Sequence, residues 1–286
     1  MEVSGMARMK VGVLSSALKD GGNPFAVIAK YGVHVTQYNN WDPDYWTEEE
    51  AERISAFAAA AGVRIAALWA GYTGPKVWNF MEGPTTLGLV PPEFRDKRVE
   101  ELKRAADFAA WCDAPAIITH CGFIPENPRD PDYQGTVDAI GSVAEHCLQC
   151  GVGFWFETGQ ETPVVLLRVI EDLGLPNLGI NLDTANVILY GKANPIDALD
   201  VFGQYVRNLH AKDGLYPTNG RELGREVQIG QGKVDFPRLL KRLHGLGFDG
   251  EVVVEREISG PQQAADIQKS VEYLRAIIAD VEKGNQ

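Results

Sequence analysis

The chain has 286 residues, of which 45% are hydrophobic and 23% charged, and its formal net charge is -12 at pH 7. An acidic chain without any run of lysine or arginine argues against a nucleic-acid binder, which would need a basic stripe to neutralise phosphates. Its most apolar window, residues 55–72, is broken by Gly62 and Arg64 and does not fit a membrane span.

The N-terminal stretch MEVSGMARMKVGV has no apolar region of the signal-peptide type, so we expect a cytoplasmic protein. Four cysteines in a chain of this length do not indicate a disulfide framework. Cys147 and Cys150 have C-x-x-C spacing, but no second Cys or His pair stands at zinc-finger distance. We interpret them as buried helix cysteines in preference to a metal or redox pair.

Short apolar runs recur along the chain, and each is followed by a polar or glycine-containing turn. The eight runs cover residues 10–17, 33–40, 63–72, 114–123, 151–159, 178–186, 206–214 and 251–260. Helical patterns lie between them, for example at 47–62, 93–112, 162–174 and 236–247, and residues 261–284 supply the last helix. Several of these helical patterns end in glycine, as a C-terminal cap does.

Eight strands alternating with helices imply parallel pairing and right-handed crossovers, and eight is the number that closes a (β/α)8 TIM barrel. The sequence therefore predicts one α/β domain that spans residues 1–286. The longest connection, roughly Tyr72 to Pro92, is rich in proline and aromatic residues. Because long barrel loops are often lids, we expect this loop to cover the mouth of the barrel.

Ionisable residues stand at the C-terminal ends of the last four predicted strands, namely Glu157, Asp183, His210 and Glu255. In a barrel these ends open on one face, and neighbouring strands lie about 4.8 Å apart. Side-chain alternation separates Asp183 from the apolar Leu178, Ile180 and Leu182, so the carboxylate faces the barrel interior. The four groups are therefore expected to converge.

Three carboxylates and one imidazole at one point would repel strongly, and a divalent cation relieves the repulsion by coordination. An oxygen-rich set with one nitrogen suits Mn²⁺, Mg²⁺, Co²⁺ or Zn²⁺. Taken singly, His210 could be a hydrogen-bonded core histidine and Glu255 a solvated strand end. Glu257 shares the face of Glu255 and is an alternative fourth ligand, but Glu255 directly ends the apolar run.

The motifs FETGQE, NLDTAN, LHAKDG, QIGQGKVDF, GFDGEVVVE and GFIPENP carry a resemblance to a known family. With them the chain, from residue 10 to its last helix, resembles the sugar phosphate isomerase/epimerase family. These are xylose-isomerase-like TIM barrels that include ketose 3-epimerases, hydroxypyruvate isomerase and inosose dehydratase. The resemblance implies one divalent metal ion bound by Glu157, Asp183, His210 and Glu255, and a small-molecule sugar as substrate.

The resemblance also implies that Glu157 and Glu255 form an acid/base pair, one on each face of a bound ketose. A metal that holds a carbonyl and a neighbouring hydroxyl stabilises a cis-enediolate and acidifies the C–H between them. Return of the proton to the other face of the same carbon gives epimerisation, and return to the neighbouring carbon gives isomerisation. Loss of a β-hydroxyl or an aglycone gives elimination.

The chain departs from the best-known epimerases at two places. Asn186 stands where they carry a histidine after the strand-six aspartate, and Lys212 with Asp213 follows His210 where they tend to have a small residue. The substrate is therefore not assumed to be an ordinary ketohexose. Candidate substrate contacts are His120, Trp69, Lys212, Asn186 and Arg225.

Each candidate contact has a structural alternative: His120 could cap its strand, Trp69 could pack in the core, and Arg225 could be a surface arginine. The GQGK segment at 230–233 lacks full P-loop spacing, so phosphate binding is the less favoured interpretation.

Competing functions are a keto-inositol dehydratase or 3-keto-glycoside lyase with the same metal site, a non-catalytic sugar-binding barrel, and an endonuclease-IV-like phosphodiesterase. The last would need more metal ligands and a basic groove. We expect no nucleic-acid or membrane partner, and a homo-oligomer is possible.

Overall fold

Eight parallel strands close into a barrel in the computed structural model, which describes residues 9–18 and 21–284. Residues 1–8, on which the expectation of no signal peptide partly rests, lie outside the described residues. The order around the barrel is β1 (Lys10–Ser16), β10 (Glu251–Val254), β7 (Val206–Ala211), β6 (Leu178–Asp183), β5 (Gly153–Glu157), β4 (Ala116–Thr119), β3 (Arg64–Ala70) and β2 (Val35–Asn40). The predicted (β/α)8 TIM barrel is confirmed.

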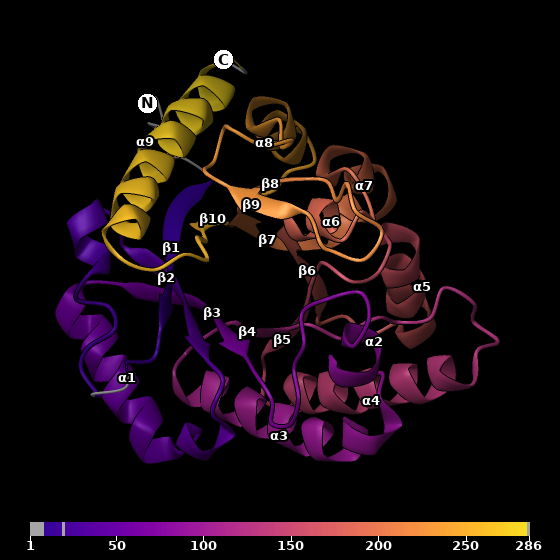
Figure 1. The fold of residues 1–286 in the computed structure, drawn as a ribbon. Coiled ribbons are helices and arrows are strands. Elements are labelled where there is room, and N and C mark those ends of the chain that lie inside the picture. Colours follow the sequence, from indigo (N-terminus) through magenta and orange to yellow (C-terminus); the bar gives the residue numbers. More distant parts are fainter. Residues whose placement is uncertain (1–8, 19–20, 285–286) are drawn as a thin grey trace.

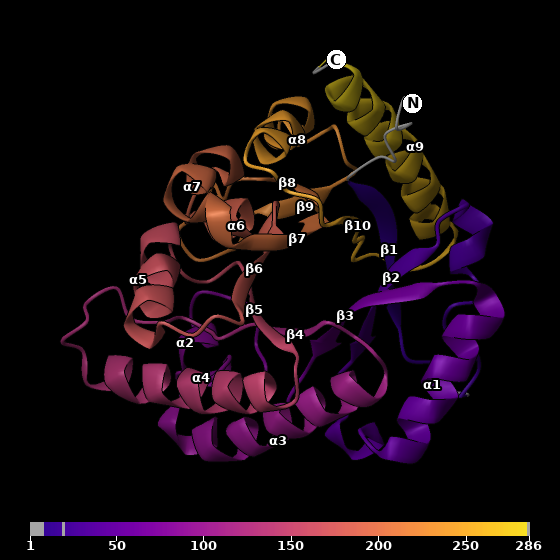
Figure 2. The same ribbon diagram turned by 180° about the vertical axis from the view of Figure 1, so that it is seen from behind.

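Helices surround the strands as an outer ring (Figure 1), and the same ring is seen from behind in Figure 2. They are α1 (Glu48–Ala61), α3 (Pro92–Trp111), α4 (Pro131–Gln149), α5 (Pro163–Leu173), α7 (Pro195–Phe202), α8 (Phe236–Gly245) and α9 (Pro261–Lys283). Local chemistry sets their limits: the Thr47 hydroxyl accepts from the Glu50 amide at the start of α1. Gly62 and Gly174 end α1 and α5 with positive φ angles of 64° and 61°, which glycine adopts without strain.

The strict alternation of strands and helices fails after the first strand. Within the described residues between β1 and β2, the one helical element is a 3₁₀ turn at Ile28–Tyr31. Gly21, Gly22 and Pro24 precede this turn and disfavour a longer helix there. Additional elements lie near the mouth: the short helices α2 (Gly83–Thr86) and α6 (Asn186–Leu189), and a hairpin of β8 (Asp213–Leu215) with β9 (Arg225–Val227).

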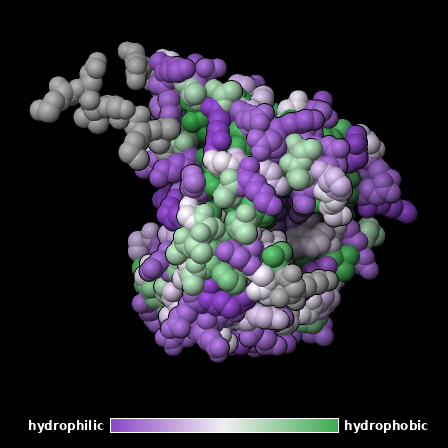
Figure 3. Space-filling model, turned by 90° about the vertical axis from the view of Figure 1, so that its left-hand side faces the viewer, coloured by the Kyte–Doolittle hydropathy of each residue, from purple (hydrophilic) through white to green (hydrophobic). Residues whose placement is uncertain are grey.

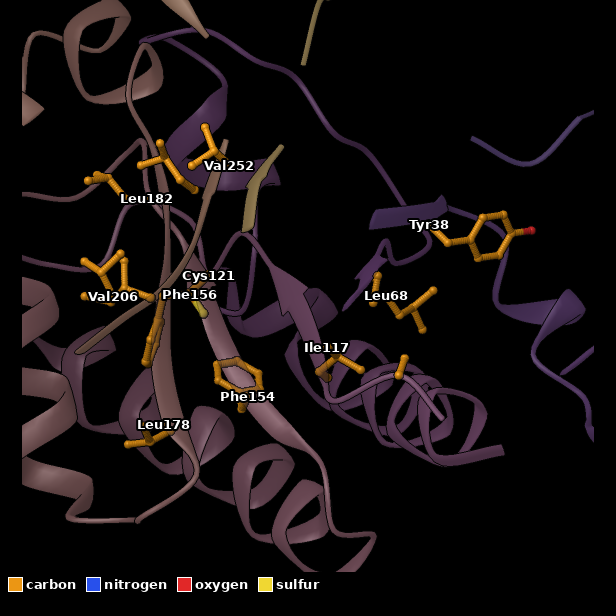
Figure 4. Packing of buried hydrophobic residues seen from close by; sticks show 14 of the residues in the cluster. Tyr38, Leu68, Ile117, Cys121, Phe154, Phe156, Leu178, Leu182, Val206 and Val252 are labelled. Atoms are coloured by element: carbon orange, nitrogen blue, oxygen red, sulfur yellow. The ribbon is translucent and has the colours of Figure 1, made fainter. Parts of the chain in front are cut away.

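Side-chain alternation gives β5 and β6 an outer apolar face and an inner face that carries the ionisable residues, while Ala67, Trp69, Ile118 and Trp155 form a small apolar cluster on the inner side of β3, β4 and β5. The outer residues Phe154, Phe156, Leu178 and Leu182 are at most 3% exposed and pack under the helices, as Figure 4 shows. The interior face of the same strands carries the polar residues, so the barrel interior is where the ionisable groups can meet.

No helix in the described part of the chain has both the length and the apolar character needed to cross a lipid bilayer. On the side of the molecule shown in Figure 3, polar residues cover most of the surface, with apolar groups scattered among them.

The two cysteines of the C-x-x-C segment differ in their environment. Cys147, within α4, is fully buried, as expected for a helix cysteine. Cys150 follows the end of α4 and is half-buried; its thiol donates to Asp107 Oδ1 at 3.2 Å. His146 Nε2 lies 2.8 Å from the same oxygen.

Candidate metal centre and its pocket

The register of the barrel brings the four predicted groups together. Strands β5, β6, β7 and β10 are neighbours, and Asp183 lies directly opposite His210 in the β6–β7 ladder. Glu157, Asp183, His210 and Glu255 each offer one ligand atom, and these four atoms all lie within 4.8 Å of one another. From His210 Nδ1, the carboxylate oxygens of Glu157, Glu255 and Asp183 are 2.8, 3.3 and 4.0 Å away.

The contacts of Asp183 explain how a carboxylate can stand at the end of a buried strand. Its Oδ1 accepts from the backbone amides of Ala185 and Asn186 at 2.8 and 2.7 Å, so the start of α6 fixes the side chain. Its Oδ2 is buried and has no hydrogen-bond partner among the described residues. Lys212 Nζ lies 3.7 Å from this oxygen, beyond hydrogen-bond distance, so the oxygen keeps a lone pair that is suited to bind a cation directly.

His210 is oriented by a residue from the other side of the barrel. Its Nε2 hydrogen bonds to Oε1 of Gln37 on β2, and the Gln37 amide in turn donates to Asn181 Oδ1 at 2.9 Å. Asn181 then donates to Glu157 Oε2. Because Gln37 Oε1 can only accept, Nε2 carries a proton and Nδ1 faces the carboxylates. Without a cation, a protonated Nδ1 donates to Glu157 Oε1 at 2.8 Å, and a bound cation would take the place of that proton.

The charges in the cluster are strongly coupled. Burial raises the pKa values of Glu157 and Asp183 above the usual carboxylate range. Burial would raise the pKa of Glu255 as well, but Lys212 and His210 hold it below that range. Burial opposes the charged forms of His210 and Lys212, yet the surrounding carboxylates raise both pKa values well above their ordinary ones.

Lys212 lies at the edge of the cluster, fully buried. Its Nζ is 2.7 Å from Glu257, 3.2 Å from Asn186 Oδ1, and 3.7 Å from both Asp183 Oδ2 and Glu255 Oε2. Because its nearest carboxylate is that of Glu257, Lys212 is shared between Glu257 and the cluster and does not by itself neutralise the cluster carboxylates. A divalent cation would offset their negative charge.

The residues present therefore fit a divalent metal ion. The donor set has three carboxylates and one imidazole, which matches the preference of Mg²⁺, Mn²⁺, Co²⁺ or Zn²⁺ for oxygen and nitrogen ligands. A cation at the centre would bind the carboxylate oxygens that surround His210 Nδ1, including Asp183 Oδ2, which accepts no hydrogen bond in the described residues. The cluster thus indicates a divalent-metal site, and its geometry does not select one metal.

Glu255 and Glu257 have different surroundings. Glu255 continues from β10, with its amide bonded to the Ala211 carbonyl, and its carboxylate points to His210. The side chain of Glu257 is 58% exposed, and its carboxylate contacts Lys212. In this geometry Glu255 belongs to the four-group cluster, and Glu257 lies nearer the mouth.

A pocket of about 320 Å³ opens above the cluster. Of the predicted substrate contacts, Trp69, His120 and Asn186 line this pocket, and Lys212 lies beneath it, bonded to Asn186. Arg225 does not reach it. This residue starts β9, is exposed, and lines a separate surface depression with Glu226 and Arg256.

Several pocket residues were not identified from the sequence: Trp41, Trp78, Gln160 and Tyr190. Gln160 lies in the FETGQE motif and Trp41 directly follows a predicted strand, so position after a strand end was the signal that could have marked both. Gln37 gave no such signal, because it lies within β2 and acts through contacts across the barrel.

The long loop after β3 is anchored at its base. Arg98, fully buried on α3, donates to the carbonyls of Thr73, Pro75 and Gly88 at 3.2, 2.9 and 2.7 Å. Its guanidinium also lies 4.3 Å from the centre of the Tyr72 ring. The loop expected to be a lid forms a wall of the pocket and contributes Trp78.

Backbone amides of the GQGK segment donate to a carboxylate from within the protein. Asp213, 1% exposed, accepts from the amides of Gly230, Gly232 and Val234 at 2.9, 2.8 and 3.1 Å. These amides would have to be free to cradle a phosphate. Asp213 therefore binds the amides that a phosphate would need. This agrees with the prediction that phosphate binding is the less favoured interpretation of the segment.

The fold and the cluster define a (β/α)8 barrel with a candidate divalent-metal site at its mouth. The chain belongs to the xylose isomerase-like TIM barrel family, whose model matches residues 25–277.

Individual relatives agree with this membership. The solved structure of a xylose isomerase domain protein from Planctomyces limnophilus is 36% identical, with a TM-score of 0.90 over 96% of this chain and 99% of that chain. A ketose 3-epimerase from Arthrobacter globiformis is 31% identical over 152 residues, 51% of this chain and 48% of its own length. An inosose dehydratase from Geobacillus kaustophilus is 24% identical over 223 residues, 64% of this chain and 71% of its own. The chain thus matches about half the length of the epimerase.

Proposed function

We propose that the protein is a divalent-metal-dependent isomerase or epimerase that acts on a ketose or a related keto-sugar. The observation that carries the proposal is the buried Asp183 Oδ2, which accepts no hydrogen bond in the described residues and lies among three other potential ligands beneath a pocket. The similarity to a ketose 3-epimerase supports sugar chemistry.

The chain's own residues would divide the work as follows. Glu157, Asp183, His210 and Glu255 would hold the metal, which when bound polarises a substrate carbonyl and the adjacent hydroxyl. Glu157 and Glu255 line the pocket, so one carboxylate can take the proton from the acidified carbon. The other, in its protonated form, returns a proton to the opposite face, and the net result is epimerisation.

A second candidate is elimination by the same residues, as in a keto-inositol dehydratase or a 3-keto-glycoside lyase. The similarity to an inosose dehydratase favours it. The first step would be the same proton transfer, and a β-hydroxyl or an aglycone would then leave with its bonding electrons. The two candidates differ in whether a group leaves, which NMR of the reaction mixture shows directly.

The test begins with the metal content of wild type and three variants after loading with Mn²⁺. Asp183→Asn keeps an acceptor for the Ala185 and Asn186 amides and removes the second carboxylate oxygen. We expect near-stoichiometric metal in wild type and in Glu257→Gln, and loss of metal in Asp183→Asn and Glu255→Gln. Retention in Glu255→Gln with loss in Glu257→Gln would assign the fourth ligand to Glu257.

Activity is then measured by deuterium uptake from D₂O across ketoses, keto-inositols and 3-keto-glycosides. Uptake at one carbon by the metal-loaded wild type supports proton abstraction next to a carbonyl. Absence of metal in the wild type and in every variant would contradict the proposal.

A further inference from the structure

The residues around the pocket divide into two opposite walls. Strands β5, β6, β7 and β10 supply the carboxylate and imidazole groups, whereas β2, β3 and β4 and their following loops supply Trp41, Trp69, Trp78 and His120. In the barrel order these two sets of strands occupy different halves. A molecule held by the metal centre therefore extends toward the aromatic half.

The aromatic residues of this wall contact one another at an angle, 48° between the planes of Trp41 and Trp69 and 83° between those of Trp41 and Trp78, so a ligand meets separate indole faces and edges. Ring centroids are 4.5 Å apart between Trp41 and Trp69 and 6.1 Å between Trp41 and Trp78. His120 closes the wall, 5.5 Å from Trp69 and 4.9 Å from Trp78. Indole faces offer a large, rigid apolar surface. The C–H face of a closed sugar ring matches such a surface, whereas an open chain is flexible and would lose more conformational entropy on binding.

Unpaired polar atoms collect around the same pocket. Twelve buried side-chain nitrogen or oxygen atoms lack a hydrogen-bond partner in the described residues, and five of them belong to residues that line the pocket. These are Asn39 Oδ1, His120 Nδ1, both amide atoms of Gln160, and the Tyr190 hydroxyl. Because buried polar groups are normally paired, these atoms are the ones that the hydroxyl groups of a ligand would satisfy after a small side-chain rotation, since each is covered by its neighbours in this structure.

The pocket disfavours anions. No arginine or lysine is found among its described lining residues, which instead include Glu157, Glu255 and Glu257. The ammonium of Lys212 lies beneath and is engaged by carboxylates. Burial lowers the pKa of His120 to about 3, so this imidazole is neutral at physiological pH. Apart from the proposed metal ion, a phosphate or carboxylate group would meet carboxylates and no basic side chain among the described residues that line the pocket.

We propose that the pocket binds a neutral, closed-ring keto-sugar, either a pyranoside or a cyclitol, with one C–H face on the tryptophan wall and its hydroxyls bonded to Gln160, Tyr190 and His120. The volume of about 320 Å³ lies at the lower end of ligand cavities, about 300–1,000 Å³, and admits one ring with a small substituent. The inference rests on the proposed function for the end of the ligand held by the metal centre and for the placement of the reacting carbons.

The test compares three stable probes by calorimetry with the Mn²⁺-loaded full chain. Methyl β-D-glucopyranoside cannot open its ring, D-sorbitol has no ring, and D-glucose 6-phosphate adds an anion. We expect the glycoside to bind at least tenfold more tightly than either of the others. Equal or tighter binding of sorbitol or the phosphate, or no measurable glycoside binding, overturns the inference.

Two variants test the named contacts. Gln160→Leu and Trp78→Leu should each weaken glycoside binding about tenfold, the loss expected for one hydrogen bond or one aromatic contact. Trp111→Leu is the matched control, because this exposed tryptophan lies at the end of α3 and does not line the pocket. Unchanged affinity in both pocket variants would show that these groups contact only water, and would overturn the assignment.

The two proposals fail in different ways. Deuterium uptake confined to open-chain ketoses, with no glycoside binding, would leave the proposed function intact and remove the closed-ring substrate. Glycoside binding by a protein that takes up no metal would support the closed-ring ligand and contradict the proposed function.

Discussion

Gln37, on β2, accepts a hydrogen bond from Nε2 of His210, on β7, across the interior of the barrel. The contact leaves Nδ1 of His210 facing the carboxylates of the candidate metal site. A partner of this kind fixes both the tautomer and the ring orientation of a ligating histidine.

Replacing Gln37 by leucine should therefore weaken metal binding by about 10- to 100-fold, because His210 loses the acceptor that orients it. Titration of the apo protein with Mn²⁺ measures the change. Thr36→Val is the matched control, because it removes a buried hydroxyl from the same strand. The Thr36 hydroxyl bonds to Val13 and Ser15 and not to the cluster. Equal losses in the two variants would indicate a general effect on the barrel.

Asp213 should contribute strongly to stability, since its carboxylate accepts from the amides of Gly214, Gly230, Gly232 and Val234. Asp213→Ala leaves these amides without their acceptor and should lower the free energy of unfolding by about 3 kcal/mol, as measured in urea. The exposed Asp249→Ala serves as control. Inorganic phosphate should not raise the melting temperature of the wild type; a clear rise would revive the phosphate-site hypothesis.

Glu161 should make stability depend on pH. Its side chain is buried and neither carboxylate oxygen has a well-formed hydrogen bond; burial raises its pKa to about 8, although backbone amides and Lys192 oppose the rise. In the unfolded chain the pKa is near 4.5, so between pH 4.5 and 8 the folded state keeps a proton that the unfolded state releases. Stability due to this group is present below pH 4.5 and is lost as the pH rises to about 8.

The Glu161→Gln variant should therefore gain stability relative to wild type as the pH increases. The whole effect corresponds to about 5 kcal/mol at most. Urea unfolding at pH 5 and pH 8.5 measures it, and Glu171→Gln, on the exposed side of α5, gives the baseline. A constant difference between wild type and Glu161→Gln at the two pH values would show that the carboxyl titrates normally.

Arg98 should hold the loop that carries Trp78. Arg98→Met leaves the carbonyls of Thr73, Pro75 and Gly88 without their donor, and should cost about 3 kcal/mol of unfolding free energy. Trypsin cleavage after Lys76, within the loop, should become faster. Arg104→Met, exposed on the same helix, should change neither quantity.

The parts of the site that follow strand ends were accessible from the sequence. Alternation along a strand gives the face of each residue, and the closure of eight strands then places Asp183 opposite His210 without further information. The absence of a full helix between β1 and β2 in the described residues was not predicted, although Gly21, Gly22 and Pro24 were a signal that could have marked it.

Contacts made across the barrel could not be predicted from the sequence. The pairing of Gln37 with His210 joins residues 173 positions apart and depends on the diameter of the closed barrel. Arg225 shows the converse: its place after a strand suggested the mouth, but the β8–β9 hairpin carries it to an exposed position. Loop geometry of this kind has no periodic signature.

The anchoring of Trp78 through Arg98 has a consequence for how such a protein could change. The groups proposed for chemistry come from residues 157–255, and the tryptophan wall comes from residues 41–78. The tryptophan wall and the metal ligands are therefore encoded in different stretches of the gene, whereas Gln160 and Tyr190 lie in the same stretch as the ligands. Exchange of the N-terminal half between related barrels, with a junction in the helix after β4, would place a new aromatic wall opposite an unchanged set of metal ligands.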